Sequence, residues 1–228
     1  MKSTTARELP IAIGTTTLQG ALRIPHGSRG IVLFAHGSGS GRLSPRNNYV
    51  AERLSNAGLT TLLFDLLTAE EEAIDSATAE LRFDIPLLTD RLVAATHWTR
   101  QHPELRDMAI GYFGASTGAA AALAAAARVP EIAAIVSRGG RPDLAGSALA
   151  KVRAPTLLIV GGNDPEVLAL NRSALAQLKC EARLEIVPGA THLFGEPGAL
   201  ESVALLAARW FEHNLQPLEP MKLQPRTK

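Results

Sequence analysis

A serine between two glycines is the first group in this sequence that could do covalent chemistry. Residues 114–118 read Gly-Ala-Ser-Thr-Gly and fit the pattern G-x-S-x-G. They follow an apolar run at 108–113 and lead into an alanine-rich run. Because a sharp strand-to-helix turn here would expose the hydroxyl of Ser116, we identify Ser116 as the candidate nucleophile. The pentapeptide alone is also typical of ordinary turns, so the flanking strand and helix carry the assignment.

A serine hydroxyl is a weak nucleophile at neutral pH and needs a base to accept its proton. His192 is the preferred base because it lies in a turn-rich loop after the last apolar run, where a side chain can reach the carboxyl edge of a sheet. We expect structural or solvent-facing roles for four other histidines, which are His26, His97, His102 and His213.

Asp164 is the candidate for the acid that orients this base. It follows the apolar run 156–160 in the sequence Gly-Gly-Asn-Asp-Pro. The same residues are typical of a helix N-cap, so a purely structural role is the alternative. Ser116, Asp164 and His192 occur in the chain order Ser, Asp, His, each after a predicted strand. This order favours a catalytic triad, because loops at the carboxyl ends of parallel strands can converge.

A glycine-rich loop at 36–41 follows the apolar run 31–34 and reads His-Gly-Ser-Gly-Ser-Gly. Enzymes with this kind of nucleophile turn place one backbone donor for the reacting oxyanion on such a loop. We expect the backbone N–H groups of Ser38 and Thr117 to form the oxyanion hole. The alternative is a flexible turn with His36 packed beneath it.

The same glycines allow a second interpretation, a dinucleotide-binding loop. A strand precedes Gly37, Gly39 and Gly41, and Asp65 ends the next predicted strand. The spacing is G-x-G-x-G, however, and a polar segment at 42–47 separates the glycines from the next helix. The hydrolase interpretation accounts for more of the candidate residues than the dinucleotide interpretation does.

Arg138 and Arg141 follow another predicted strand and are possible substrate-binding residues. Arginine matches a carboxylate or phosphate through two parallel hydrogen bonds, although an arginine at such a position is more often a surface ion-pair partner. The acidic run 70–72 and Asp75 are expected to be solvated at a helix start and outside the active site. Cys180 is expected to be an inert thiol, since no histidine is adjacent to it.

Six short apolar runs alternate with helix-like stretches, which predicts an α/β fold with a mostly parallel sheet and helices on both faces. The connection 68–84 is too short for a large lid domain. The predicted strands are 30–35, 59–64, 108–113, 132–136, 155–160 and 182–187. The predicted helices are 48–56, 85–101, 117–128, 166–178 and 198–214.

The two ends of the chain are predicted to lie outside this alternation. Residues 11–18 and 19–24 indicate an antiparallel pair at a sheet edge, with its turn near 18–20. Residues 215–228 contain three prolines and several charges, which is typical of a loosely attached tail. We therefore predict a single domain at 1–214 and a tail at 215–228.

The composition of the chain limits the classes of partner that it is expected to bind. The 23 basic and 22 acidic residues give a formal charge of +1, so no broad field would attract nucleic acid or an anionic membrane. The polar first ten residues do not fit a signal peptide, and the single cysteine suits a reducing compartment, which together predict a cytoplasmic protein. We expect a small-molecule acyl substrate and neither a cofactor nor a metal. The oligomeric state stays open.

The quoted motifs resemble the dienelactone hydrolase-like branch of the α/β-hydrolase superfamily over about residues 30–214. The resemblance rests on the loop 36–40, the pentapeptide 114–118, the turn 161–164 and the loop 189–194. It implies the α/β-hydrolase fold and hydrolysis of ester-type bonds. Dienelactone hydrolases use a cysteine nucleophile, whereas this chain has Ser116, so the resemblance does not imply dienelactone as the substrate.

The predicted function is hydrolysis of a small ester, lactone or related acyl substrate through an acyl-enzyme on Ser116. An acyltransferase or thioesterase would share this intermediate and differ only in the acceptor or leaving group. A noncatalytic ligand-binding protein on the same fold is the alternative from another class.

Overall fold

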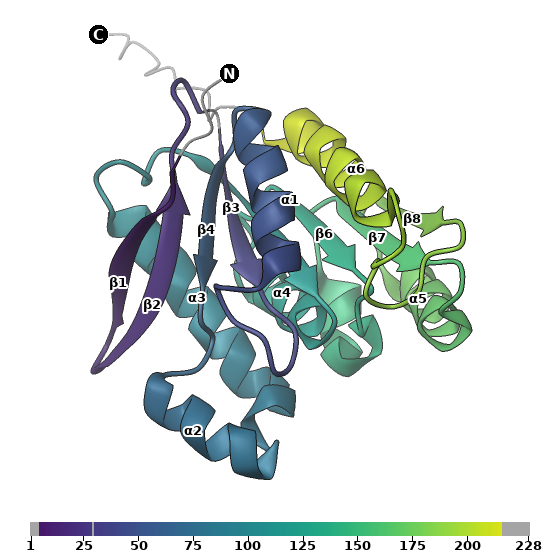
Figure 1. The fold of residues 1–228 in the computed structure, drawn as a ribbon, viewed down its shortest axis with the longest axis horizontal. Helices are drawn as coiled ribbons and strands as arrows, with labels where there is room; N and C mark the ends of the chain where they lie inside the picture. The colour runs from purple at the N-terminus through teal and green to yellow at the C-terminus, as the bar shows by residue number, and fades with distance from the viewer. Residues whose placement is uncertain (1–4, 29, 216–228) are drawn as a thin grey trace, which may run out of the picture.

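In the computed structural model, which describes residues 5–28 and 30–215, one eight-stranded sheet runs through the molecule (Figure 1). Its strand order is β1-β2-β4-β3-β5-β6-β7-β8. From β4 to β8 in this order all neighbours are parallel, whereas β2 is antiparallel to both β1 and β4. The bounds are β1 Arg7–Ile13, β2 Thr16–Arg23, β3 Gly30–Ala35, β4 Thr60–Phe64, β5 Ala109–Ala115, β6 Ala134–Arg138, β7 Thr156–Gly161 and β8 Ala182–Val187.

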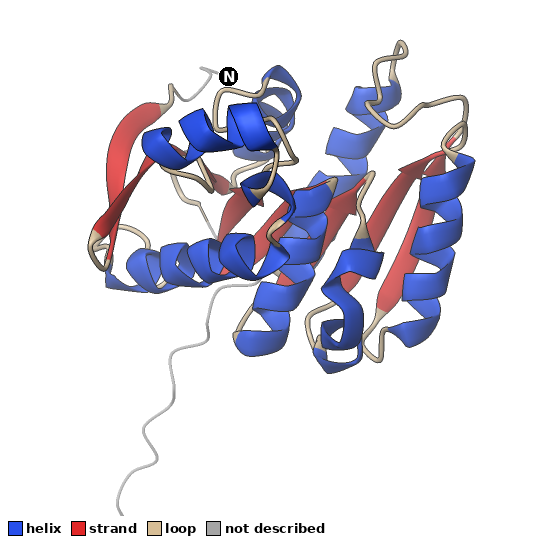
Figure 2. Ribbon diagram, turned by 90° about the horizontal axis from the view of Figure 1, so that it is seen from below, coloured by secondary structure: helices blue, strands red, loops and turns tan. Residues whose placement is uncertain are grey.

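Helices cover both faces of the sheet, as predicted (Figures 1 and 2). Helices α1 and α6 lie on one face, and α3, α4 and α5 lie on the other. Helix α2 lies at the carboxyl end of the strands, at the bottom of Figure 1. The bounds are α1 Pro45–Asn56, α2 Ala69–Thr78, α3 Ile85–Gln101, α4 Thr117–Arg128, α5 Pro165–Gln177 and α6 Ala199–Asn214, with short 3₁₀ segments η1 Leu81–Phe83 and η2 Pro142–Lys151.

Two apolar layers, one on each face, hold the sheet in place. The first joins α3 and α4 to the sheet through side chains such as Leu92, Tyr112 and Leu123. The second joins α1 and α6 to the opposite face through side chains such as Leu54 and Phe211. Strands with apolar residues on both sides are therefore required at the centre, which explains why the runs of β3, β5 and β7 do not alternate with polar residues.

The first hairpin differs from its prediction. The turn lies at Gly14 and Thr15, because Ile13 pairs with Thr16, and the segment 18–20 is inside β2. Gly14 has a φ of +58°, a conformation that glycine adopts without steric cost. The prediction was wrong because Gln19 and Gly20 resemble a turn, whereas they lie inside a strand in which Leu18 and Gly20 are buried.

Three other predictions also need correction. The connection 68–84 holds α2 and η1, and η2 lies after β6; a helix start was expected at the acidic run 70–72, but none of these three elements was among the predicted helices. Asp75 is not solvated, because its side chain is fully buried in an ion pair with Arg82. Leu215, the first residue of the predicted tail, is 2% exposed and packs in the core, so this residue belongs to the folded domain. Residues 216–228 lie outside the described part.

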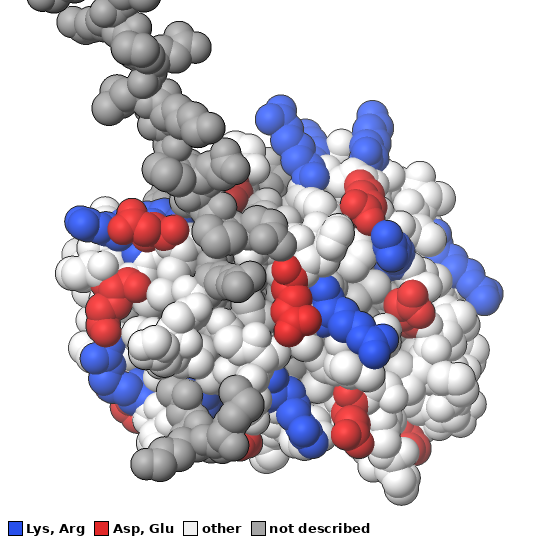
Figure 3. Space-filling model, turned by 90° about the horizontal axis from the view of Figure 1, so that it is seen from above, with Lys and Arg blue, Asp and Glu red and all other residues white. Residues whose placement is uncertain are grey.

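Charges of both signs are interspersed on the face seen in Figure 3, in keeping with the formal charge of +1. Among residues 5–28 and 30–215, every helix is too short or too polar to cross a lipid bilayer.

Candidate active site

Ser116 lies on the turn between β5 and α4 in a strained backbone conformation. Its φ is +50° and its ψ is −121°, which is rare for a residue with a side chain and costs about 1–3 kcal/mol. The loop after β6 holds this turn, since the N–H of Ser116 donates to the carbonyl of Arg138 at 3.2 Å and its carbonyl accepts the N–H of Arg141 at 3.1 Å. The side chain of Ser116 remains partly exposed.

The glycines on either side of Ser116 are required by close backbone contacts. A Cβ on Gly118 would lie 2.2 Å from the carbonyl oxygen of Ala35, and a Cβ on Gly114 would lie 2.5 Å from Cα of Ala119. Both distances are far below van der Waals contact. Helix α4 can therefore begin directly beneath the end of β3 only because these two positions carry no side chain.

The structure brings Asp164 and His192 together. Nδ1 of His192 lies 2.8 Å from Oδ2 of Asp164, whose other oxygen, Oδ1, accepts the N–H of Val167 at 3.4 Å and caps α5. One oxygen of Asp164 thus contacts the candidate base while the other caps a helix, so the two interpretations from the sequence do not exclude each other. The side chains of Asp164 and His192 are 14% and 38% exposed, so the histidine faces the open end of the site.

Among the described residues, the hydroxyl of Ser116 makes no hydrogen bond, so the candidate nucleophile is not bonded to the candidate base His192. The loop after β6 nevertheless lies next to both groups. The carbonyl of Arg138 accepts the N–H of Ser116, and a Cβ on Gly139 would lie 3.6 Å from Cε1 of His192. Catalytic hydrogen bonds are often loose in the absence of substrate.

The proposed oxyanion loop lies directly against the nucleophile. A Cβ on Gly37 would lie 3.1 Å from Cβ of Ser116. Within the part of the chain that the structure describes, the N–H groups of Ser38 and Thr117 donate to no protein acceptor. Thr117 is also the first residue of α4, where the helix dipole favours negative charge. Two free donors are thus available close to Ser116.

His36 fixes the start of this loop. Its Nδ1 donates to the carbonyl of Gly37 at 3.0 Å, and its Nε2 accepts the N–H of Leu66 at 2.9 Å, which requires a neutral ring. Burial lowers the pKa of His36 below its ordinary value of 6.5. The histidine packs beneath the loop, as the alternative interpretation expected, yet its two hydrogen bonds hold the loop to the end of β4.

Asp65 fixes the far end of the same loop. Its carboxylate accepts hydrogen bonds from the backbone N–H of Arg42, at 2.7 Å, and from the Arg42 side chain. Asp65 is therefore occupied by the loop itself and is not free to bind a ribose. Helix α1 begins only at Pro45, well after the glycines. Neither observation supports the dinucleotide interpretation.

The two candidate arginines have different environments. Arg141 forms two hydrogen bonds with Asp143, at 2.9 and 2.7 Å, and the hydrogen bond to this carboxylate raises the pKa of Arg141. Arg138 is 8% exposed and makes one long contact, 3.5 Å from Nη2 to Oδ1 of Asn47. Burial, and then the charge of Arg46, lower the pKa of Arg138 to about 10.

Several residues near the site were not found from the sequence. Arg46 is at the second position of α1, where the helix dipole disfavours a cation. A positive charge at the start of a helix is unusual, and this feature of the sequence could have identified Arg46. Asn171, fully buried on α5, donates to the carbonyl of Gly140 at 2.9 Å and supports the loop after β6. Glu72 and Arg82 line a narrow hollow together with Ser38, which corrects the expectation that the acidic run lies away from the site.

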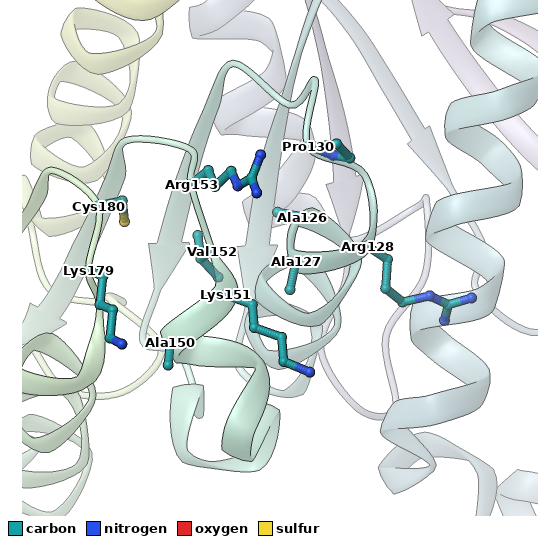
Figure 4. Close-up of a pocket in the computed structure, with 10 residues that line it drawn as sticks. All are labelled: Ala126, Ala127, Arg128, Pro130, Ala150, Lys151, Val152, Arg153, Lys179 and Cys180. Atoms are coloured by element: carbon teal, nitrogen blue, oxygen red, sulfur yellow. The ribbon is translucent and has the colours of Figure 1, made fainter.

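Two larger hollows lie at opposite ends of the parallel strands. One, of about 830 Å³, is lined by the loop 38–46, the start of α2 and part of β2. The other, of about 670 Å³, is lined by the ends of α4 and η2 and by Lys179 and Cys180, with Lys151 and Arg153 on its wall (Figure 4). Cys180 is half-buried there, and burial raises the pKa of its thiol. Among the described residues, no cluster of three or more His, Cys, Asp or Glu side chains could hold a metal ion.

Comparison with known proteins then settles the family. The model of the dienelactone hydrolase family matches residues 18–219. The chain belongs to the dienelactone hydrolase family. A crystal structure of a dienelactone hydrolase from Anabaena variabilis is 59% identical, with a TM-score of 0.93 over 94% of this chain and 100% of that chain. Family membership confirms the predicted resemblance and the predicted α/β-hydrolase fold.

Two further relatives carry different names. A protein of Mycobacterium tuberculosis, provisionally named a phosphoribosyl transferase, is 55% identical over 210 residues, which are 91% of this chain but 46% of the relative. The chain thus spans about half the length of this relative. A Bradyrhizobium protein named a probable 2-oxo-3-(5-oxofuran-2-ylidene)propanoate lactonase is 31% identical over 64% of this chain and 66% of its own length.

Proposed function

We propose that this member of the family is a serine hydrolase that cleaves small esters or lactones through an acyl-enzyme on Ser116. The observation that carries the proposal is the hydrogen bond between His192 and Asp164 beside a strained, partly exposed serine. In the neutral histidine, this bond places the proton on Nδ1 and leaves Nε2 as the base.

The reaction begins when the hydroxyl oxygen of Ser116 attacks the substrate carbonyl carbon and Nε2 of His192 accepts its proton. The resulting imidazolium is stabilised by Asp164, and the oxyanion accepts hydrogen bonds from the N–H groups of Ser38 and Thr117. His192 then donates the proton to the departing alcohol, which leaves an acyl-Ser116 ester. A water molecule, deprotonated by His192, attacks this ester and releases the acid and the free serine.

Esters with a small acid part and lactones are the substrate class we favour. The connection between β4 and α3 holds only α2 and η1, so no large lid covers the site. One relative is named as a lactonase, which supports including lactones. Phosphoribosyl transfer is not proposed, because that name belongs to a protein about twice as long and the residues gathered here suit acyl transfer. A cytoplasmic location stays a prediction.

The proposal is tested by measuring hydrolysis of short acyl esters, five- and six-membered lactones and acyl thioesters by the protein and by Ser116→Ala. We expect Ser116-dependent turnover of esters or lactones. Turnover restricted to thioesters, or acyl transfer to an added alcohol in preference to water, would instead establish a thioesterase or an acyltransferase. No Ser116-dependent turnover of any of these would favour the noncatalytic binding protein.

A further inference from the structure

Arg138 is a buried cation without a counter-ion. Its side chain is 8% exposed at the end of β6, and its Nε and Nη1 atoms have no hydrogen-bond partner within the described residues. Its guanidinium carbon lies 6.0 Å from the centroid of the Phe194 ring. Burying a charged group in this way is costly unless another charge compensates it.

A second cation lies close by and increases this imbalance. Arg46 is the second residue of α1 and precedes Asn47, the residue that Arg138 contacts, and Nε of Arg46 is also buried without a partner among the described residues. The positive charge of Arg46 acts on Arg138 directly, since it helps to lower the pKa of Arg138. The amino end of α1 adds a partial positive charge. Across residues 5–28 and 30–215, neither arginine has an ion pair with a carboxylate.

This pair of cations borders the proposed active site from two sides. The carbonyl of Arg138 accepts the N–H of Ser116, and Phe194 belongs to the loop that carries His192. Arg46 lines the hollow of about 830 Å³ that Ser38 also lines. Arg138 thus follows directly on the backbone that holds Ser116, and Arg46 shares a hollow with the proposed oxyanion donor Ser38.

We propose that Arg46 and Arg138 bind a dianionic phosphate monoester group carried by the substrate of this hydrolase. The inference rests on the proposed function and names its substrate class. Two arginines and a helix amino end require about two negative charges, which a phosphate monoester supplies and a single carboxylate does not. The planar guanidinium also matches phosphate oxygens with two parallel hydrogen bonds. Arg141 has no part in this subsite, because Asp143 occupies its guanidinium.

Three acetate esters that differ only in one substituent test the charge requirement in the unmodified protein. They are the acetates of glycerol, of glycerate at its 3-hydroxyl, and of glycerol 3-phosphate at its 1-hydroxyl. We expect kcat/KM to be about 10- to 100-fold higher for the phosphorylated ester than for the neutral ester, as one or two hydrogen bonds to charged groups provide, with the carboxylate ester between them. Equal values for the three esters, or a preference for the carboxylate, would overturn the proposal.

Variants then locate the subsite. In Arg46→Gln and in Arg138→Met, the ratio of kcat/KM for the phosphorylated ester to that for the neutral ester should fall to near one. The exposed Arg153, at the opposite end of the sheet, supplies the matched control Arg153→Gln, which should keep the ratio of the unmodified protein. A fall of the ratio in Arg141→Gln, with no fall in Arg46→Gln, would place the phosphate elsewhere and refute the assignment.

A binding measurement separates this inference from the proposed function. Inorganic phosphate should raise the Tm of the unmodified protein, relative to chloride at equal ionic strength, and should not raise that of Arg46→Gln. Absence of Ser116-dependent turnover of all three esters would contradict the hydrolase and leave this shift as the test of the subsite. Turnover without any phosphate-dependent shift in Tm, and without a preference among the esters, would contradict the subsite alone.

Discussion

The two ends of the parallel strands carry hollows of about 830 and 670 Å³, and both are lined partly by cations. At the amino end, the cationic side chains of Lys151, Arg153 and Lys179 are exposed, and their charged ends lie well apart in Figure 4. At the carboxyl end, Arg138 is buried without a counter-ion beside a strained serine. The two hollows are thus similar in size but differ in charge, because the carboxylates of Asp65, Glu70 and Glu72 also line the one at the carboxyl end, whereas no carboxylate of the described residues lines the other. What distinguishes the carboxyl end is a set of polar groups without protein partners among the described residues. They are Nε and Nη1 of Arg138 and the backbone N–H groups of Ser38 and Thr117.

Replacing Ser116, the proposed nucleophile, should produce the largest difference between the two ends of the sheet. In Ser116→Ala we expect kcat for the best short ester to fall by about 10⁴- to 10⁶-fold, the range seen when a catalytic nucleophile is removed. The measurement is the initial rate of ester hydrolysis, with circular dichroism to establish that the variant is folded. A variant that keeps a tenth of the original rate would remove Ser116 from the mechanism.

The proposed catalytic role of Asp164 can be separated from its structural role, since one oxygen contacts His192 and the other caps α5. Asn can still cap α5 but cannot stabilise the imidazolium, so Asp164→Asn should lower kcat by about 10²- to 10⁴-fold with little change in Tm. Asp164→Ala should lose the same activity and in addition about 1 kcal/mol of unfolding free energy. Equal activity of Asp164→Asn and the unmodified protein would show that the carboxylate serves only as a cap.

His36 should affect stability in a pH-dependent way. Because burial lowers the pKa of His36 in the folded protein, the unfolded chain takes up the proton first as the pH falls below 6.5. This contribution to stability is therefore present above pH 6.5 and is lost as the pH falls toward the lower pKa of the folded state. We expect Tm to fall less steeply between pH 7.5 and 5 in His36→Gln than in the unmodified protein. Parallel curves for the two proteins would contradict the role of neutral His36.

The smallest effect is expected at the amino end. The double variant Lys151→Gln, Arg153→Gln removes two exposed charges from the hollow of about 670 Å³. It should leave kcat/KM for neutral and phosphorylated esters unchanged within about twofold and unfolding free energy within about 0.5 kcal/mol per site. A loss of activity similar to that of Asp164→Asn would show that the amino end of the sheet also contributes to the reaction.

Most of the buried strands and helices could be predicted from the sequence, because the residues of each element are enough to indicate its type. The apolar runs of β3 and β5 and the alanine-rich α4 are recognisable from their own residues, and the G-x-S-x-G pattern lies between two of them. The hairpin turn was misplaced because Gln19 and Gly20 resemble a turn, although they lie inside β2, where Leu18 and Gly20 are buried. Helix α2 was missed although Thr68 and Glu71 form a capping box at its start.

Contacts between distant segments could not be predicted in this way. The chain order suggested that Asp164 and His192 meet, yet only the structure shows that one oxygen of Asp164 caps a helix while the other contacts the histidine. In the same way, Arg138 and Arg141 are equivalent in the sequence. Asp143 neutralises one of them, whereas the other lies buried near Arg46, far away along the chain.

The central claim is that Ser116 is a nucleophile activated by its surroundings. The most direct measurement is reaction with a fluorophosphonate probe followed by peptide mass spectrometry. The account predicts one adduct, on the peptide that contains Ser116, with labelling that is strongly slowed in His192→Ala and absent in Ser116→Ala. An adduct on another residue, or equal labelling of Ser116→Ala, would contradict it.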